Sequence, residues 1–466
     1  MTNTELSNEF ELLYSNNANV GPGLDEYDKS VFLTMAQEEI VKLLSEMVEI
    51  KSISSDKNHR DDVDSSAQFV QNLFADLGLN TQVVKVAGGM PAVVAHTEID
   101  PSKKTVLLYA HHDVQPVGDV DLWNTEPFEP VVKDGRLYGR GSGDNKSGVV
   151  VHYNVVKQLL SDLPVNIRIF IEGEEEIGSP TMSDFIEQNR EALEADVIII
   201  ADSGNVKIGV PTITTTLRGL VDAIIEVDQP MRPIHSGVGG GVVPDAFMVL
   251  SRIIASFHNE KGELMIEGLT PTDMQVTELE ESFLKKMLGS DEINLFDTES
   301  ISKRLWLEPA LDVLAIDAPP VKDAVNLVIP KASAKISLRL PPTEDPEHAM
   351  KMLEEHVLKN IPWNASVKFI PNSKGSGVVA DPNKPFTTEL VKNFNSIWEN
   401  ETAYIGVGGS IPFANDFVRE FPNAELVLVG AADEELGNAH APNESVQIDH
   451  IEMLIESIVK TLKNIS

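Results

Sequence analysis

The sequence predicts an α/β fold, in which a mostly parallel sheet with helices on both faces is interrupted by an inserted α+β domain. Apolar, strand-like runs alternate with amphipathic helical segments in the N-terminal part of the chain and again near its end. Acidic or histidine residues directly follow three of these runs, at the edge where open α/β sheets bind ligands. After about residue 211 polar and apolar residues alternate along the strands instead, as they do in antiparallel strands with one solvent-exposed face.

The length of 466 residues exceeds one ordinary domain and indicates two. Because the last portion returns to α/β character, the alternating middle part reads as an insertion. The run PNSKGSG after position 370 is a plausible return hinge. We therefore expect a discontinuous domain of residues 1–213 and 373–466 and an inserted domain of residues 214–372.

Composition and charge exclude several classes of partner. Lys and Arg number 37 against 73 Asp and Glu, a formal net charge of −36, which repels nucleic acid backbones and anionic membranes. The chain has no cysteine, so disulfides and thiolate metal sites are excluded and any transition-metal ligands must be His, Asp or Glu. No secretory signal or apolar run of membrane-spanning length is evident, which predicts a cytoplasmic protein without a membrane partner.

The individual elements follow from hydrophobic periodicity. In the first part we expect helices over 29–50, 65–77, 147–160 and 182–193, and buried strands at 105–110, 167–171 and 197–201. In the insert we expect the strands TITTTLRG, LVDAIIEVD and VIPKASAKISLRL, a helix over 246–257 and helical structure in the acidic stretch 277–295. The last part predicts a helix over 386–398, the strand ELVLVG and a helix over 451–465.

The strand TVLLYA is followed directly by two candidate functional residues, His111 and His112. His111 is placed as a metal ligand, and Asp113, two residues further on the same side of an extended chain, can orient its imidazole. His112 points the other way and is packed or exposed. A lone strand-end histidine is usually structural, but the HxD pattern beside RGxxDxK favours a metal site.

A two-metal hydrolytic site also needs a bridging carboxylate and a base. Asp144 is the bridge candidate, because it follows two glycines at the start of a helix; its alternative role is a helix cap. The run Glu174–Glu176 is commonly just a solvated turn, but adjacent carboxylates after a buried strand can serve as ligand and general base. Asp202, after VIIIA, and His440, in GNAHAPNE, complete the candidate ligands.

Taken in order, HxDV, RGSGDNKSG, EGEEEIGS, Asp202, HSGVGGG, GGSIP and NAHAPNE resemble the motifs of one metallopeptidase family. That family contains carnosinases, cytosolic nonspecific dipeptidases, acetylornithine deacetylases, succinyl-diaminopimelate desuccinylases and bacterial carboxypeptidases. The resemblance covers roughly residues 30–465, and YAHHDVQP, EGEEEIGS and GGSIP look most like the dipeptidase–carnosinase branch.

The resemblance implies a role for each matching residue. His111 and Asp202 would hold one metal, Glu176 and His440 the other, with Asp144 between them, and Glu175 would be the general base. In the insert, which would act as a lid and dimerisation domain, His235 would stabilise the tetrahedral intermediate and reach the neighbouring subunit's site in a homodimer. Arg339 would bind the substrate's carboxylate, and Asn326 and Ser410 would make further substrate contacts.

The implied activity is hydrolysis of the amide bond of dipeptides by a water that two metal ions activate. An alternative is deacylation of N-acetyl or N-succinyl amino acids, and a third is a catalytically silent binding protein. The two divalent ions would be zinc in most relatives, while manganese or cobalt also suits His and carboxylate ligands. No histidine lies between Pro371 and Pro385, where related dipeptidases often offer one to the substrate, so substrate selectivity stays open.

Overall fold

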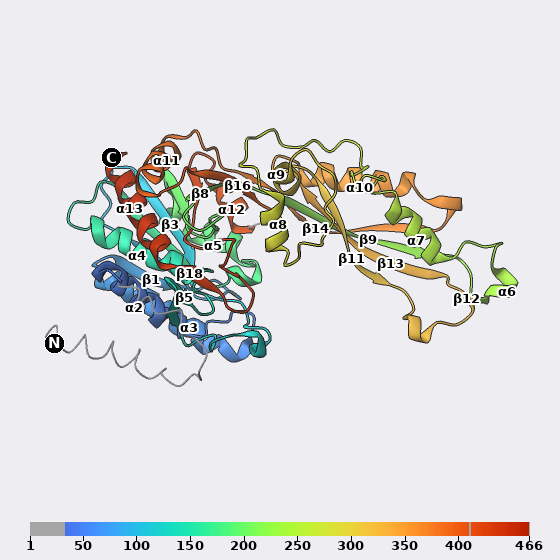
Figure 1. The fold of residues 1–466 in the computed structure, drawn as a ribbon, viewed down its shortest axis with the longest axis horizontal. Coiled ribbons are helices and arrows are strands. Elements are labelled where there is room, and N and C mark those ends of the chain that lie inside the picture. Colours follow the sequence, from blue (N-terminus) through green and yellow to red (C-terminus); the bar gives the residue numbers. More distant parts are fainter. Residues whose placement is uncertain (1–32, 410–411, 466) are drawn as a thin grey trace.

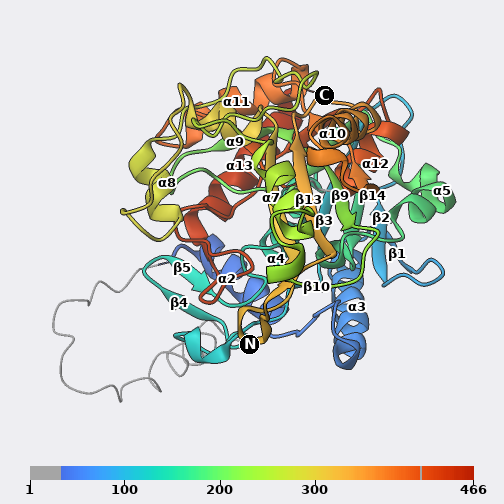
Figure 2. The same ribbon diagram turned by 90° about the vertical axis from the view of Figure 1, so that its right-hand side faces the viewer.

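The computed structural model describes residues 33–409 and 412–465. Figure 1 shows an α/β body that contains both the first and the last part of the described chain, and an elongated insert that projects from it. Figure 2, which looks along the long axis, places the insert in front of this body. The two parts correspond to two kinds of sheet, one mainly parallel and one antiparallel.

The large sheet has nine strands, and its centre is parallel. Along the sheet they are ordered β1 (Asn80–Val84), β2 (Ala92–His96), β6 (Asn166–Glu172), β3 (Thr105–His111), β7 (Val197–Ile200), β17 (Glu425–Leu428), β8 (Thr212–Leu217) and β15 (Val378–Val379), with β16 (Ala403–Val407) also on β8. Strands β6, β3, β7 and β17 run parallel, so their carboxyl ends meet at one edge. Parallel pairing aligns His111 with Glu172.

Helices cover both faces of this sheet, so its central strands are buried on both sides. Along β3, Val106 and Leu108 join one core, whereas Leu107 and Tyr109 join the other. The first core includes side chains of α2 (Met35–Val48), α3 (Arg60–Asp76), α4 (Lys146–Leu159), α11 (Pro385–Ile397) and α13 (Ile448–Asn464). The second includes α5 (Met182–Leu193) and α12 (Pro412–Glu420). This architecture confirms the predicted fold class.

The insert is built on a four-stranded antiparallel sheet. Its order is β11 (Ala310–Asp317), β13 (Lys331–Leu340), β9 (Gly219–Asp228) and β14 (Val367–Gly375). Helices α7 (Ala246–Ala255) and α10 (Pro346–Lys359) pack on one face of it. The far end carries β10 (Ile234–His235), α6 (Ser236–Gly239) and β12 (Leu327–Val328) (Figure 1). Two short helices, α8 (Glu281–Met287) and α9 (Ile301–Trp306), lie nearer the large sheet.

Smaller elements complete the described chain. A three-stranded sheet, β18 (Ser445–Gln447), β5 (Arg136–Tyr138) and β4 (Val131–Lys133), joins the C-terminal part to the segment before α4. Short 3₁₀ helices are η1 (Lys57–His59), η2 (Val120–Leu122), η3 (Glu175–Ile177), η4 (Val321–Asp323) and η5 (Pro362–Asn364). Within residues 33–409 and 412–465, no helix combines the length and apolarity needed to cross a membrane.

Two expectations about individual elements were wrong. The stretch 277–295 forms only the short α8, because Gly289 adopts a left-handed backbone (φ 76°) and ends the helix. The run TITTTL, expected in the insert, forms β8 of the large sheet, and all six of its residues are buried. The change from one sheet to the other therefore occurs between Leu217 and Gly219.

Candidate metal centre and active site

Six side chains are expected at the metals, namely five ligands and the base Glu175. The five expected ligands form two groups at the carboxyl edge of the large sheet. The first group is His111, Asp144 and Asp202, and the second is Asp144, Glu176 and His440. In each group the potential ligand atoms lie within 4.8 Å of one another. Strands β3, β6, β7 and β17 supply four of the residues at or after their ends, and the segment before α4 supplies Asp144.

Asp144 is shared, and its two carboxylate oxygens face different imidazoles. Oδ1 lies 3.0 Å from Nε2 of His111, and Oδ2 lies 2.9 Å from Nε2 of His440. A carboxylate that presents one oxygen to each group has the arrangement of a bridge between two cations. The alternative role as a helix cap is wrong, because Asn145 occupies the N-cap position of α4.

His111 is fully buried at the end of β3 and is surrounded by carboxylates. Its Nε2 lies 3.3 Å from Oδ1 of Asp202, and its Nδ1 lies 3.1 Å from the backbone oxygen and 3.3 Å from Oδ1 of Asp113. Burial alone would lower the pKa of His111, but the carboxylates of Asp202, Asp113 and Asp144 outweigh it and raise the pKa well above its usual value. The surroundings of this ring therefore favour positive charge.

His440 lies on an exposed loop opposite His111. Its Nε2 is 3.1 Å from Oε2 of Glu176, and hydrogen bonding to Asp144 and Glu176 raises the pKa of His440 to about 10. The backbone of His440 has a positive φ of 61°, as do Asn438 and Asn443 on the same loop. This loop conformation directs the ring toward the carboxylates.

Glu175 begins η3 between the two groups. Its Oε2 lies 3.9 Å from Nε2 of His111, and its side chain is partly exposed. Burial raises the pKa of Glu175 to about 9, His111 opposes this shift, and the charges of Asp202 and Asp144 add to it. The place of this carboxyl group beside the two potential cation sites suits a general base.

Glu174 has a different role from its two neighbours. Its buried carboxylate accepts hydrogen bonds from the backbone N–H of Met90 at 3.0 Å and from the N–H and hydroxyl of Thr181 at 2.8 and 2.5 Å. These contacts fix the turn from which Glu175 and Glu176 project. The reading of the run as a solvated turn is therefore wrong.

The residues present fit two divalent cations. Among the described residues, no Lys or Arg forms an ion pair with Asp144, Glu175, Glu176 or Asp202, so the excess negative charge at the site is balanced only by the two histidines. Oε2 of Glu176 is buried, and within the described part of the chain its only ion-pair partner is Nε2 of His440 at 3.1 Å. Such a buried oxygen is costly unless a proton or a cation occupies the space beside it. Imidazole and carboxylate ligands suit zinc, manganese or cobalt.

Sequence reasoning missed several supporting residues. Asn145 donates hydrogen bonds to the Ala201 carbonyl at 2.8 Å and to Oδ1 of Asp202, and thus orients an expected ligand. The Tyr109 hydroxyl donates to Oε2 of Glu172 at 2.6 Å, and burial raises the pKa of Glu172 to about 8. The only available signal was their position next to expected ligands in the chain.

His112 is packed away from the site, one of its two expected outcomes. The ring is buried and its Nε2 lies 2.9 Å from the Pro91 carbonyl oxygen. Burial lowers the pKa of His112 to about 4, so the ring is neutral at physiological pH. Among the described residues, none of the expected ligand carboxylates lies at hydrogen-bonding distance from this ring, unlike that of His111.

The expected substrate-binding residues lie at two different places. Arg339 pairs in register with Leu220 at the start of β9, the end of the insert nearest the large sheet. His235 and Asn326 lie together at the far end, where the Ser236 N–H donates to the Asn326 carbonyl at 2.9 Å (Figure 1). Since β9 has ten residues at about 3.3 Å each, the two places are roughly 30 Å apart. Ser410 lies outside the described residues.

A buried arginine that sequence reasoning did not single out accompanies Arg339. Arg218 lies between β8 and β9, and its guanidinium donates to the carbonyls of Leu305 at 2.8 Å and Glu308 at 2.6 Å. Burial, together with the charge of Arg339, lowers the pKa of Arg218 to about 10. The guanidinium of Arg218 thus connects the sheet junction to the end of α9.

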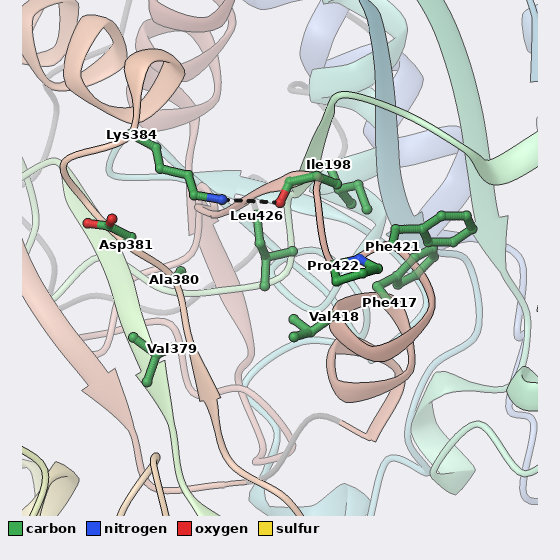
Figure 3. A pocket seen from close by; sticks show the side chains of 11 residues that line it. Ile198, Val379, Ala380, Asp381, Lys384, Phe417, Val418, Phe421, Pro422 and Leu426 are labelled. Atoms are coloured by element: carbon green, nitrogen blue, oxygen red, sulfur yellow. Dashed lines mark hydrogen bonds between the residues drawn. The ribbon is translucent and has the colours of Figure 1, made fainter.

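A separate pocket of about 120 Å³ lies between α12 and the segment after β15 (Figure 3). Its lining is mostly apolar and includes Ile198, Phe417 and Leu426, with Lys384 at one side. Ile198 and Leu426 stand near the amino ends of β7 and β17, opposite the edge that carries the expected ligands. The pocket is therefore distinct from the metal centre.

Comparisons with known proteins agree with this architecture. The model of the peptidase family M20/M25/M40 matches residues 107–464. The chain is 33% identical over 430 residues to a cysteinylglycine-S-conjugate dipeptidase of Corynebacterium striatum, covering 90% of this chain and 94% of that one. It is 30% identical over 445 residues to a Cys-Gly metallodipeptidase of Schizosaccharomyces pombe, covering 89% and 93%. An M20 family metallo-carboxypeptidase of Sulfolobus solfataricus superimposes with a TM-score of 0.76 at 27% identity, covering 91% and 98%.

A model of a phage tail ring protein also matches, over residues 1–98. In the structure, the described part of this segment contributes α2, α3, β1 and β2, and β2 pairs directly with β6 of the large sheet. It is thus an integral part of the α/β body, and the match assigns no separate function. The predicted resemblance and metallopeptidase class are confirmed: the chain belongs to the peptidase family M20/M25/M40.

Proposed function

We propose that the chain hydrolyses the amide bond of dipeptides at the centre formed by His111, Asp144, Glu176, Asp202 and His440. The observation that carries this proposal is the shared carboxylate of Asp144, whose two oxygens face His111 and His440. Two of the relatives described above are dipeptidases for Cys-Gly and cysteinylglycine conjugates, which supports a dipeptide as the substrate.

His111 and Asp202 would hold one divalent cation, Glu176 and His440 a second, with Asp144 between them. Bound there, the two cations supply a lowered pKa for the attacking water and polarisation of the scissile carbonyl. Zinc suits the ligand set, as do manganese and cobalt. Asp113 would hold the His111 ring through its Nδ1.

Glu175 would move the proton. Its carboxylate accepts a proton from the water as the water attacks the scissile carbonyl carbon, and then donates that proton to the leaving amine. The guanidinium of Arg339 would bind the substrate's terminal carboxylate in a bidentate manner. Such binding restricts cleavage to the end of a peptide, which is exopeptidase action. Asn326 and Ser410 would add further substrate contacts.

His235 would stabilise the oxyanion in the centre of a second subunit. It is exposed at the far end of the insert, and its Nδ1 accepts a hydrogen bond from the Gly237 N–H at 3.0 Å. Apolar side chains around this end are also exposed, as homodimer interfaces require before assembly. They include Val238, Val242, Leu314, Ile316, Val321 and Val325. A homodimer through the insert would cover them.

We also propose the division into a discontinuous catalytic domain and an inserted lid. The change of sheets supports limits of the insert at about residues 219 and 375, close to the expected 214 and 372. All five proposed metal ligands then belong to the catalytic domain, and Arg339, His235 and Asn326 belong to the insert.

A substrate panel with controlled metals tests the proposed reaction. The purified chain is stripped with a chelator, resupplied with zinc, manganese or cobalt, and assayed with Cys-Gly, β-Ala-His and Ala-Ala. N-acetyl and N-succinyl amino acids form the second half of the panel. We expect metal-dependent cleavage of dipeptides; turnover confined to the acylated amino acids would instead establish a deacylase, and no turnover at all a binding protein.

A further inference from the structure

Glu444, which is not among the proposed ligands, lies buried directly behind the metal centre. Its carboxylate accepts four hydrogen bonds from the loop that leads to Asp144. Oε2 accepts from the Arg140 guanidinium at 2.6 Å and from the Gly141 N–H at 3.1 Å, and Oε1 accepts from the N–H groups of Gly143 and Asp144 at 3.0 Å each. The N–H groups of Gly143 and Asp144 are consecutive, and successive N–H groups that converge on one carboxylate form an anion-binding nest.

The two segments joined by this contact each carry a proposed ligand. One is the loop 140–144, which ends at Asp144. The other is the loop 437–445, which contains His440 and is closed by a hydrogen bond from the Ser445 N–H to the Gly437 carbonyl at 2.9 Å. Arg140 adds a second link, because its Nη2 lies 3.4 Å from the Ala441 carbonyl oxygen.

The parts of the two segments that carry Asp144 and His440 lie outside regular secondary structure. Gly141 has a φ of 83°, and His440 and Asn443 have φ values of 61° and 64°. The ladder between β18 and β5, with the hydrogen bond from the Gly139 N–H to the Glu444 carbonyl at 3.0 Å, holds the bases of the two loops. Beyond these bases, the relative position of the parts that carry Asp144 and His440 depends on side-chain contacts such as those of Glu444. The separation of Asp144 from His440 is therefore coupled to this carboxylate.

We propose that Glu444 is a positioning residue that sets the distance between Oδ2 of Asp144 and Nε2 of His440 and thereby tunes one of the two cation sites selectively. The group Asp144, Glu176 and His440 draws ligands from both loops that Glu444 joins. The group His111, Asp144 and Asp202 depends on this contact only through Asp144, whose Oδ1 is held independently by His111 at 3.0 Å. The inference rests on the proposed two-metal function and adds a source of asymmetry within it.

Replacement by glutamine tests the proposal, because an amide has nearly the same shape but no charge and turns one acceptor into a donor. An NH₂ group would then face a backbone N–H or the Arg140 guanidinium. Loss of a residue that orients metal ligands typically weakens metal binding about 10–100-fold. For Glu444→Gln we expect this loss at the site of Asp144, Glu176 and His440. At the site of His111, Asp144 and Asp202 we expect less than a threefold change.

The chain offers a matched control in Glu425. This carboxylate is also buried and accepts three hydrogen bonds, from the N–H groups of Phe386 at 3.1 Å and Thr387 at 2.7 Å and from the Thr387 hydroxyl at 2.9 Å. It holds the start of α11, at the opposite end of the strands from the ligands. Glu425→Gln should lower stability to a similar extent and leave both metal affinities unchanged.

The experiment is calorimetric titration of Zn²⁺, and separately Mn²⁺, into the metal-stripped full chain, with thermal unfolding of each stripped variant alongside. Two unchanged affinities in Glu444→Gln, an equal loss at both sites, or the same selective loss in Glu425→Gln would overturn the inference. If Glu444→Gln does not fold, Glu444→Asp, which keeps the charge and shortens the reach, is judged by the same criteria. Failure of both variants to fold would assign Glu444 a structural role alone. Fewer than two bound ions in the unaltered chain would instead refute the proposed metal set.

Discussion

The carboxylate of Asp113 accepts a hydrogen bond from the backbone N–H of Glu176 at 3.1 Å. The two residues belong to different segments, since Asp113 follows β3 and Glu176 follows β6. The other oxygen of Asp113 lies 3.3 Å from Nδ1 of His111. One buried carboxylate thus contacts a proposed ligand of each cation, which extends its expected role beyond the orientation of a single imidazole.

Replacement of Asp113 by asparagine should therefore weaken both cation sites. The amide retains the shape but removes the negative charge that stabilises the His111 ring. We expect metal affinity and activity to fall about 10–100-fold, measured by metal titration and by dipeptide turnover. Asp100→Asn, which changes an exposed carboxylate bound to Ser102, is the control and should match the unaltered chain. Unaltered metal binding in Asp113→Asn would contradict this role.

Glu175→Gln should separate metal binding from turnover. Loss of the general base is expected to lower kcat by about 10²–10⁴-fold, with both cations still bound. The neighbouring Glu174→Gln is the comparison, because that carboxylate fixes the turn through Met90 and Thr181. It should lower the unfolding free energy by about 1–3 kcal/mol and reduce kcat much less. A Glu175→Gln enzyme with kcat within tenfold of normal would refute the assignment.

Arg339→Lys should act on substrates with a free carboxyl terminus. Lysine keeps the charge but cannot form the two parallel hydrogen bonds of a guanidinium. We expect kcat/KM for dipeptides to fall by about tenfold or more, since one hydrogen bond to a charged group contributes about 1.5–3 kcal/mol. The matching dipeptide amides, which lack the carboxylate, should be cleaved equally by both proteins. A parallel loss on the amides would show that Arg339 does not read the carboxylate.

Subunit mixing tests the proposed action of His235 in a second subunit. Each of the variants His235→Ala and Glu175→Ala should be nearly inactive alone, because each homodimer lacks one essential group at both centres. In a heterodimer one of the two centres has both groups, so up to about half of the activity of the unaltered dimer should return. Purification through two different tags verifies the heterodimer. No recovery in that species would place His235 outside the neighbouring centre.

His152 predicts an acid-dependent loss of stability in the metal-stripped chain. Its buried ring contacts the Tyr109 carbonyl oxygen at 2.8 Å, and burial lowers the pKa of His152 from 6.5 to about 4. The unfolded chain therefore binds this proton first, and the stabilisation is present above pH 6.5 and lost as the pH falls to 4, by up to roughly 3 kcal/mol. His152→Gln should be less stable than the unaltered chain at pH 7, with a smaller difference at pH 4.5, as measured by denaturant unfolding. His348→Gln, at an exposed site, should show no such convergence.

The candidate ligand positions could be predicted from the sequence, because a polar side chain directly after a buried, apolar strand can be recognised from the order of residues alone. His111 and Asp202 are of this kind. The role of Glu444 could not be predicted, since its partners Arg140 and Asp144 lie 304 and 300 residues away in the chain. Such contacts depend on the packing of two irregular loops and leave no periodic pattern.

The prediction assigned β8 to the wrong sheet for a chemical reason. Its threonines are typical of the solvent-facing positions of a half-exposed strand, yet all six residues of β8 are buried. The hydroxyl of Thr215 is accommodated by a hydrogen bond to the Ile405 carbonyl at 3.1 Å. Threonine can therefore alternate with apolar residues in a strand that is buried on both faces, and alternation alone did not distinguish the two sheets.

The insert leaves and rejoins the large sheet at neighbouring points, because Leu217 pairs with Val378 and Leu220 pairs with Gly375. The insert is thus joined to the large sheet by two neighbouring segments of chain. All five proposed ligands lie outside the segment from Gly219 to Gly375, whereas Arg339, His235 and Asn326 lie within it. Under the proposed roles of Arg339, His235 and Asn326, exchange of this one segment between relatives would transfer peptide selectivity and subunit pairing to an unchanged set of proposed metal ligands, and both properties could diverge in evolution while the hydrolytic chemistry stayed constant.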